Sequence, residues 1–294
     1  MPNLLENQRI GLLAGWGDFP LVVARALRDQ GASVYGLGIK DHVDPSLAEL
    51  CDVYQQIGVA KLGAAVRFYQ QYGVDQATMA GKIHKTLLFK RFYWIKHFPD
   101  ALFFKTFYPH FISKTRDRKD DTLLGTIVAT FADHGIHFAP ATDFAPELLV
   151  RHGMVAGRQL NRGQLKDVEF GWHLASEMGR LDVGQSVCVK GQAVLAVEAV
   201  EGTDECIRRA GELCPAGGFT VVKVAKPQQD MRFDVPTIGR RTIETMRSVG
   251  ASVLAVQADK TILLDQEKIK SLAERHGIQI VALQEPTVAD RQAA

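Results

Sequence analysis

The chain has 294 residues, which suggests two domains because a domain typically has roughly 100–200 residues. Hydrophobic residues make up 46% and charged residues 23%, and the 35 basic and 33 acidic side chains nearly cancel. This is the composition of an ordinary globular protein and not of a histone-like or acidic-tail protein. The longest stretches without Asp, Glu, Lys or Arg, Thr122–Ala132 and Ser248–Ala258, have 11 residues each. A helix that spans a bilayer needs about 20 apolar residues, so none is expected.

Two further features indicate where the protein works. The four cysteines form no Cys-x-x-Cys pair and have no histidine-rich partner spacing, so neither a zinc site nor a disulfide scaffold is expected. Residues 1–9 lack the basic and then apolar order of a secretory signal. We therefore expect a cytoplasmic enzyme with reduced cysteines.

The first part of the chain alternates strands and helices. The pattern predicts strands at residues 9–14, 33–39, 78–80 and 136–138, and helices at 21–30, 62–72 and 122–134. Such alternation is typical of a parallel sheet covered by helices, and we predict an α/β, Rossmann-like N-terminal domain over residues 1–152. Residues 153–164 are rich in Gly, Arg and Gln, and they are predicted to be a linker.

The second part has a different order of predicted helices and strands. After a helix from residue 165 to 178, two short apolar runs flank Lys190-Gly191, which indicates a β-hairpin. Helices are then predicted at 204–213, 237–249 and 266–276, and strands at 219–224, 252–257, 261–264 and 279–283. We predict a mixed α/β C-terminal domain over residues 165–294.

Basic and aromatic residues gather between the residues Lys82 and Lys119. This segment has ten basic and two acidic residues, and ten of the chain's aromatic rings lie between residues 89 and 111. Rings beside Lys and Arg suit an anionic lipid surface. The same mixture could stack the bases of a single-stranded nucleic acid, or form a helical hairpin with solvated lysines.

A glycine turn, Gly15-x-Gly17-x-x-Pro20, follows the first predicted strand. Glycines let a backbone approach an anion, and the next helix offers its positive N-terminus, so the turn favours a nucleotide or phosphate. The third glycine of the dinucleotide fingerprint is replaced by Pro20, and Asp41 is the nearest acidic residue to the end of the second strand. The turn is therefore weaker support for NAD, and a tight turn without a ligand is an open alternative.

Polar residues follow other predicted strands or precede helices. Gly81-Lys82 could place a cation near phosphates, whereas Asp120-Asp121 could bind a metal or cap a helix. Asp182 carries the same ambiguity, and it lies in a segment, residues 182–186, that leads polar side chains into a strand.

The densest polar group lies in the segment from Lys223 to Pro236. If this segment is extended, Asp230, Arg232 and Asp234 project to one side because side chains alternate along extended backbone. Two carboxylates with a guanidinium between them suit Mg²⁺ plus a phosphate, although a surface salt-bridge loop is the alternative. The residues alone thus indicate a two-domain Mg²⁺-dependent enzyme acting on a phosphorylated substrate.

Seven stretches spread over nearly the whole chain resemble the UDP-2,3-diacylglucosamine pyrophosphatases of the LpxI type. They are residues 10–20, Gly81-Lys82, 120–124, 181–186, 196–204, 226–230 and 232–239. The family more often has glycine where this chain has Lys119, and leucine where it has Phe19; neither change removes a candidate ligand.

The resemblance implies Mg²⁺-dependent hydrolysis of UDP-2,3-diacylglucosamine to UMP and 2,3-diacylglucosamine 1-phosphate (lipid X), a step of lipid A synthesis. It also implies a lipid substrate bound between two domains, and it gives residues 82–119 a purpose as a peripheral contact with the cytoplasmic face of the inner membrane. No nucleic-acid partner is then expected, and the oligomeric state is not predicted.

The resemblance also suggests roles for individual residues. Mg²⁺ is expected on Asp234, with Asp230 as co-ligand, while Arg232 and Lys226 stabilise charge developing on the phosphate. The expected substrate-binding residues lie in the matching stretches: Gly15, Gly17, Gly81, Lys82, Asp120, Asp121, Asp182, Gln185, Ser186, Thr203 and Gln229. Two rival classes stay open, an NAD(P)-dependent oxidoreductase and a non-catalytic protein that binds membranes or nucleic acid.

Overall fold

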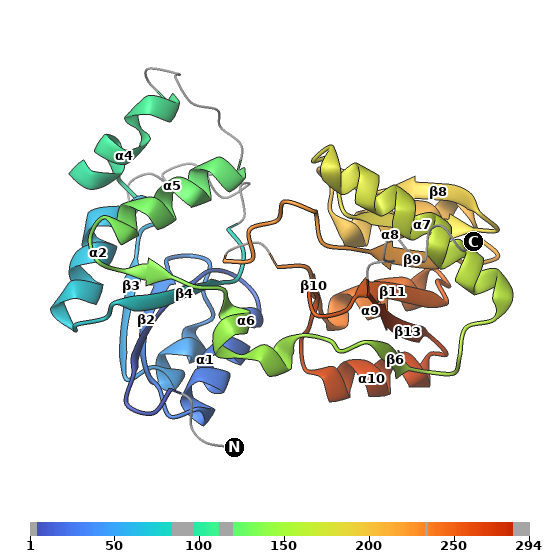
Figure 1. Ribbon diagram of the computed structural model, residues 1–294, viewed down its shortest axis with the longest axis horizontal. Coiled ribbons are helices and arrows are strands. Elements are labelled where there is room, and N and C mark those ends of the chain that lie inside the picture. Colours follow the sequence, from blue (N-terminus) through green and yellow to red (C-terminus); the bar gives the residue numbers. More distant parts are fainter. Residues whose placement is uncertain (1–4, 84–96, 112–119, 233–234, 285–294) are drawn as a thin grey trace. The chain divides into compact units, whose positions relative to one another are not determined.

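The computed structural model describes residues 5–83, 97–111, 120–232 and 235–284, without the side chains of 109–111 and 120–121. The chain forms two compact units, Met1–Pro146 with Asp230–Phe233, and Glu147–Gln229 with Asp234–Ala294 (Figure 1). Each unit has its own sheet and its own buried core.

The first unit is built on a parallel sheet. Among the described residues its strand order is β3-β2-β1-β4-β5, and every neighbouring pair runs parallel. The strands are β1 (Arg9–Ala14), β2 (Ser33–Ile39), β3 (Val53–Ile57), β4 (Gln76–Ala80) and β5 (His137–Phe138). The order reverses between β1 and β4, which confirms the predicted Rossmann-like sheet.

Helices cover this sheet on both faces. They are α1 (Phe19–Asp29), η1 (Pro45–Leu50), α2 (Leu62–Gln71), α5 (Asp120–Ala132) and α6 (Ala141–Phe144). A further helix, α4 (Ala101–Phe111), packs on α2 and α5. Along β1, Ile10 and Leu12 are fully buried. Gly11 faces the other way, where a Cβ atom would lie 2.7 Å from the ring of Tyr69 on α2. Tyr69 and Phe131 of α5 share one core on that face, so β1 is buried on both sides.

The second unit contains a mixed sheet with the strand order β6-β13-β11-β9-β7-β8 within the described residues. β9, β11 and β13 are parallel, whereas β6, β7 and β8 pair antiparallel with their neighbours. The strands are β6 (Gly153–Ala156), β7 (Ser186–Lys190), β8 (Ala193–Val197), β9 (Thr220–Lys223), β11 (Val253–Gln257) and β13 (Gln279–Leu283). The β7–β8 pair confirms the predicted hairpin.

One face of this sheet packs on α7 and the other on three shorter helices. α7 (Arg162–Arg180) contributes Trp172 and Met178 to one core. The other core contains residues of α8 (Thr203–Leu213), α9 (Arg240–Ser248) and α10 (Gln266–Arg275). A small parallel pair, β10 (Thr237–Ile238) and β12 (Ile262–Leu263), and a short turn of helix, η3 (Pro146–Leu148), complete the described elements.

The stretch 153–164, predicted to be a linker, contains secondary structure. Gly153–Ala156 forms β6, which pairs with β13, and Asn161 begins α7 with a capping box that includes Gln164. β6 is an edge strand in which only Ala156 is buried, so it lacks the apolar pattern of an inner strand. The linker prediction was wrong for these residues because an edge strand needs little apolar sequence.

Candidate active site

The glycine turn after β1 meets the Gly81-Lys82 turn after β4. Trp16 donates its backbone N–H to the carbonyl of Lys82 at 2.8 Å, and Lys82 donates to the carbonyl of Trp16 at 3.0 Å. A Cβ atom on Gly15 would lie 2.7 Å from the Lys82 carbonyl oxygen. Gly81 has a φ of +90°, and its Cβ would lie 2.8 Å from Trp16 oxygen. Glycine is therefore required on both sides for the two turns to lie this close.

This pair of turns lies where an α/β sheet usually binds its ligand. β1 and β4 are the strands between which the strand order reverses, and ligands of open parallel sheets bind beyond the carboxyl ends of such strands. α1 starts directly after the turn, its first turn has no acidic residue, and Gly17 has a φ of +104°. The positive helix end and the exposed Lys82 suit an anion such as a phosphate.

Asp41, which follows β2, is held by a histidine. Its Oδ2 lies 3.5 Å from Nε2 of His97, a side chain that is fully buried. The backbone N–H of Val59 donates to Nδ1 of the same ring, and burial lowers the pKa of His97. In NAD enzymes an acidic residue at this place binds the ribose hydroxyls. Because Asp41 contacts His97, this arrangement gives no support to the NAD(P) reading.

Asp120 and Asp121 lie at the first two positions of α5. This is the place predicted for residues that cap a helix or bind a metal or substrate. Their side chains lie outside the described residues, so both alternatives stay predictions.

Arg232 folds back onto Asp230. The Arg232 Nε lies 2.9 Å from Oδ1 and 3.1 Å from Oδ2 of Asp230, and the backbone N–H of Arg232 donates to Oδ1 at 3.0 Å. The hydrogen bonds from Arg232 hold the pKa of Asp230 below its usual range. Over 230–232 the backbone forms a turn instead of the expected extended segment, because the carboxylate of Asp230 accepts from both the guanidinium and the backbone N–H of Arg232. The side chains of Asp230 and Arg232 do lie on one side, as expected.

The fit of this segment to Mg²⁺ depends on which oxygens are available. Both oxygens of Asp230 accept hydrogen bonds from Arg232, and Asp234 lies outside the described residues. Among the side chains that the structure describes, no three His, Cys, Asp or Glu residues gather in a way that could hold a metal ion. The described residues alone thus do not build a metal site, and Mg²⁺ stays a prediction that rests on Asp234.

Lys226 contacts the turn between α7 and β7. Its Nζ lies 2.7 Å from Oδ1 of Asp182, a residue with a φ of +56°. Gln229 accepts a hydrogen bond from the backbone N–H of Lys226 through its Oε1. Three predicted site residues, Lys226, Asp182 and Gln229, thus lie together at the end of β9 that carries Lys223.

Ser186 and Thr203 belong to a buried polar cluster that we call the Thr203 cluster: Ser186, Glu198, Thr203 and Lys223. The Thr203 hydroxyl donates to Glu198 Oε1 at 3.1 Å and accepts from Lys223 Nζ at 2.9 Å. Ser186 is fully buried, and its hydroxyl lies 3.3 Å from the hydroxyl oxygen of Thr203. The cluster ties the N-terminus of α8 to the ends of β7 and β9.

Lys223 and Glu198 were not predicted as functional residues. They are 6% and 8% exposed, although ionised side chains are rarely buried unless they are paired. The signal was present in the sequence, since a Lys directly follows the apolar run of β9 and a Glu interrupts another apolar run. Oε2 of Glu198 is buried and has no hydrogen-bond partner among the residues that the structure describes. A direct contact of Ser186, Gln185 or Thr203 with a substrate stays a prediction.

Comparison with known families divides the chain near residue 150, close to the division in the fold, except that the fold groups residues 230–233 with the first unit. Residues 9–148 match the model of the LpxI N-terminal domain, and residues 151–281 match the LpxI C-terminal domain. The chain belongs to the LpxI family. It is 28% identical over 285 residues to a protein of Caulobacter vibrioides named UDP-2,3-diacylglucosamine pyrophosphatase LpxI, and the match covers 94% of this chain and 98% of that protein. The predicted family membership is confirmed.

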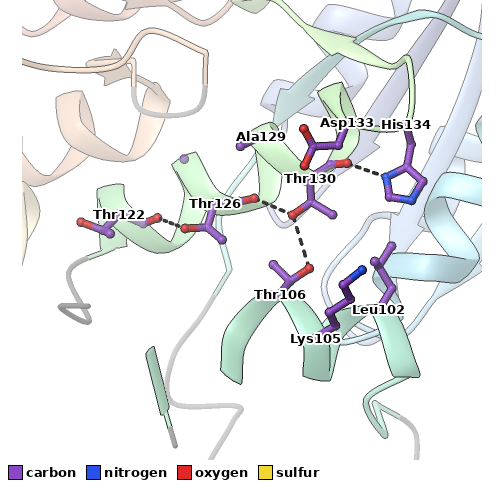
Figure 2. A pocket seen from close by; sticks show the side chains of 10 residues that line it. Leu102, Lys105, Thr106, Thr122, Thr126, Ala129, Thr130, Asp133 and His134 are labelled. Carbon is purple, nitrogen blue, oxygen red and sulfur yellow. Dashed lines mark hydrogen bonds between the residues drawn. The ribbon is translucent and has the colours of Figure 1, made fainter. Parts of the chain in front are cut away.

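This LpxI family member also has an open groove between α4 and α5, with a volume of about 550 Å³ (Figure 2). Small residues line it on α5, and Lys105, Asp133 and His134 lie among its lining residues. The hydroxyls of Thr126 and Thr130 donate to carbonyls one turn earlier in α5. The hydroxyl of Thr130 also lies 3.3 Å from the hydroxyl of Thr106 on α4, so the threonines join the two helices as well as bonding within α5.

No helix in the described ranges is both long and apolar enough to cross a membrane. The aromatic residues of the segment 82–119 fall partly outside these ranges, since residues 84–96 and 112–119 are not described. On α4, the rings of Phe103 and Phe107 contact each other in a tilted arrangement at a centroid distance of 4.6 Å, with Phe107 buried. Phe104 and Tyr108 are more than half exposed, as is the neighbouring Phe98. α4 thus has one buried and one exposed aromatic face.

Proposed function

We propose that this protein hydrolyses UDP-2,3-diacylglucosamine to UMP and 2,3-diacylglucosamine 1-phosphate, a step of lipid A synthesis. The observation that carries the proposal is that both LpxI domains match in order, at 9–148 and 151–281. The name of the Caulobacter vibrioides relative supplies the reaction. A new bond forms between water oxygen and one phosphorus, the bridging P–O bond breaks, and the bridging oxygen leaves with that bond's electrons.

The substrate carries a pyrophosphate, so the site must supply positive charge. We assign the headgroup to the paired turns at Gly15 and Lys82, where a helix N-terminus and an ammonium group favour a phosphate. Lys226 and Arg232 are kept as the residues that stabilise charge in the transition state, with Asp182 and Asp230 holding the two cations in place.

Mg²⁺ remains part of the proposal, with Asp234 as the residue assigned to it. A bound Mg²⁺ supplies neutralisation of phosphate charge and a lowered pKa for a water molecule. Asp230 is the weaker candidate ligand because Arg232 already contacts both of its oxygens.

We further propose peripheral attachment to the cytoplasmic face of the inner membrane through the segment 82–119. The exposed rings of Phe98, Phe104 and Tyr108 and the local excess of basic residues support this contact. Aromatic rings lie at the level of the headgroups, and lysines attract anionic lipid. A substrate with two acyl chains resides in such a leaflet, so attachment places the enzyme next to it.

The test is turnover of UDP-2,3-diacylglucosamine with Mg²⁺, with EDTA, and with EDTA followed by excess Mg²⁺. We expect UMP and lipid X in equal amounts, lost with EDTA and restored by Mg²⁺, as followed by mass spectrometry. Water labelled with oxygen-18 identifies the phosphorus that is attacked, since the label appears in only one product. Absence of both products in every condition would refute the proposed reaction, and turnover in EDTA would refute the metal requirement.

A further inference from the structure

The residue between the two glycines of the first turn is a tryptophan, and its side chain is 42% exposed. By contrast, Trp172 is 5% exposed. Exposure of a large aromatic surface costs free energy in water, and tryptophan is the side chain with the largest such surface. A ring presented to solvent next to a phosphate-binding turn is therefore a candidate for ligand contact.

The backbone holds Trp16 rigidly. Both its N–H and its carbonyl bond to Lys82, and the flanking glycines are required by close approach at Gly15 and by a φ of +104° at Gly17. A turn whose backbone is already fixed loses little backbone entropy when a ligand packs on the side chain that it carries.

The chemistry around Trp16 selects the kind of ligand. Lys82 and the start of α1 favour a phosphate, so a group packed on the indole is the ring joined to that phosphate. In the proposed substrate that ring is either the glucosamine or the ribose with its uracil. The same unit carries the exposed aromatic residues of α4, which we assign to the lipid surface, and the acyl chains are attached to glucosamine.

We propose that Trp16 packs against the glucosamine ring of the substrate, with Lys82 on the adjoining phosphate. The C–H groups of a pyranose carry partial positive charge, which matches the negative face of an aromatic ring. This assignment rests on the proposed function, and it adds a residue that determines recognition of the sugar.

Fluorescence of the full chain tests the assignment with two probes, glucosamine 1-phosphate and UMP. Glucosamine 1-phosphate should change the tryptophan emission of the native chain and of Trp172→Phe, at concentrations that inhibit turnover. Trp16→Phe should lose that change, and UMP should cause none in any of the three proteins. An unchanged emission at inhibitory concentrations, or a Trp16-dependent response to UMP alone, would overturn the assignment.

Steady-state kinetics give a second readout. We expect Trp16→Ala to raise KM for UDP-2,3-diacylglucosamine by about 3- to 10-fold with kcat within about twofold of native, and Trp16→Phe to recover most of the loss. If Trp16→Ala instead lowers kcat by about 3- to 10-fold and leaves KM unchanged, Trp16 only supports the turn and the assignment is wrong. If the native chain hydrolyses the substrate but glucosamine 1-phosphate does not change its tryptophan emission, only the assignment of Trp16 is refuted. If the native chain does not hydrolyse the substrate, the proposed function itself is refuted.

Discussion

The guanidinium of Arg232 forks onto the carboxylate of Asp230, with Nε 2.9 Å from Oδ1 and Nη2 2.5 Å from Oδ2. A forked pair fixes the direction of both side chains and keeps both charged. The turn over 230–232 is closed by the same carboxylate through the backbone N–H of Arg232. The guanidinium of Arg232 is thus held in one orientation by Asp230.

The Asp230–Arg232 pair should make stability depend on pH in acid. The folded-state pKa of Asp230 is held below 3.8, so its contribution is present above the unfolded pKa and is lost as pH falls through the folded pKa. We expect Arg232→Gln to be less stable than native at neutral pH, with the gap closing below about pH 4. Urea denaturation across this range measures the gap.

Arg180→Gln is the matched control for that experiment. Arg180 pairs with Glu177 on the surface of α7, where both side chains are largely exposed. Exposed pairs contribute little, so this variant should match native at every pH. If the difference in unfolding free energy between Arg232→Gln and native stayed the same below about pH 4, it would contradict the Asp230–Arg232 pairing.

Asp234→Asn should abolish most turnover if Asp234 holds Mg²⁺. We expect kcat to fall on the order of 100-fold or more, because the amide loses the negative charge that a hard cation requires. Asp259→Asn is the control, since Asp259 pairs with Arg151 in the second unit, outside the residues assigned to the site. Near-native turnover of Asp234→Asn at saturating Mg²⁺ would show that the metal, if needed, binds elsewhere.

Alanine at two glycines of the first unit should have opposite effects on stability. Gly81 has a φ of +90°, and a Cβ there would lie 2.8 Å from backbone atoms of Gly15 and Trp16, so Gly81→Ala should cost about 2–4 kcal/mol. Gly125 in α5 has open space around its Cβ position, and Gly125→Ala should stabilise by about 0.5–1 kcal/mol. Urea denaturation compares the two; a neutral Gly81→Ala would contradict the close approach of the turns.

Lys223→Met should destabilise the second unit by about 3 kcal/mol, because it leaves the buried Glu198 without a compensating charge. Adding Glu198→Gln should recover much of this loss, since the amide removes the uncompensated charge. A double-mutant cycle by chemical denaturation measures the coupling. Strictly additive effects would mean that the two charges do not interact through Thr203.

The aromatic face of α4 should control lipid binding. Phe104→Ser combined with Tyr108→Ser should reduce flotation with vesicles containing anionic phospholipid, because the exposed rings no longer enter the interface. Phe170→Ser on α7 replaces another partly exposed ring and should leave flotation unchanged. If the native chain stays with the unbound fraction, the proposed membrane contact is wrong.

Most of the fold could be predicted from the pattern of the sequence. Short apolar runs with glycines beside or within them predicted the parallel strands β1, β2 and β4. Such strands are buried on both faces, so their sequences are continuous apolar runs. β6 was missed because an edge strand with a single buried residue leaves almost no apolar signal.

The candidate site was only partly predictable. Sequence determined the family and the two domains, and it placed the glycine turn and Gly81-Lys82 after predicted strands, because apolar runs and glycine spacing follow local rules. The tertiary structure decided that these two turns meet. Only the tertiary structure decided that Arg232 turns back onto Asp230, and that Lys223 and Glu198 share the hydroxyl of Thr203. The Thr203 cluster joins residues from different elements, so its pairings depend on which charges burial brings together, whereas the Asp230–Arg232 contact depends on a local turn that the extended pattern did not predict.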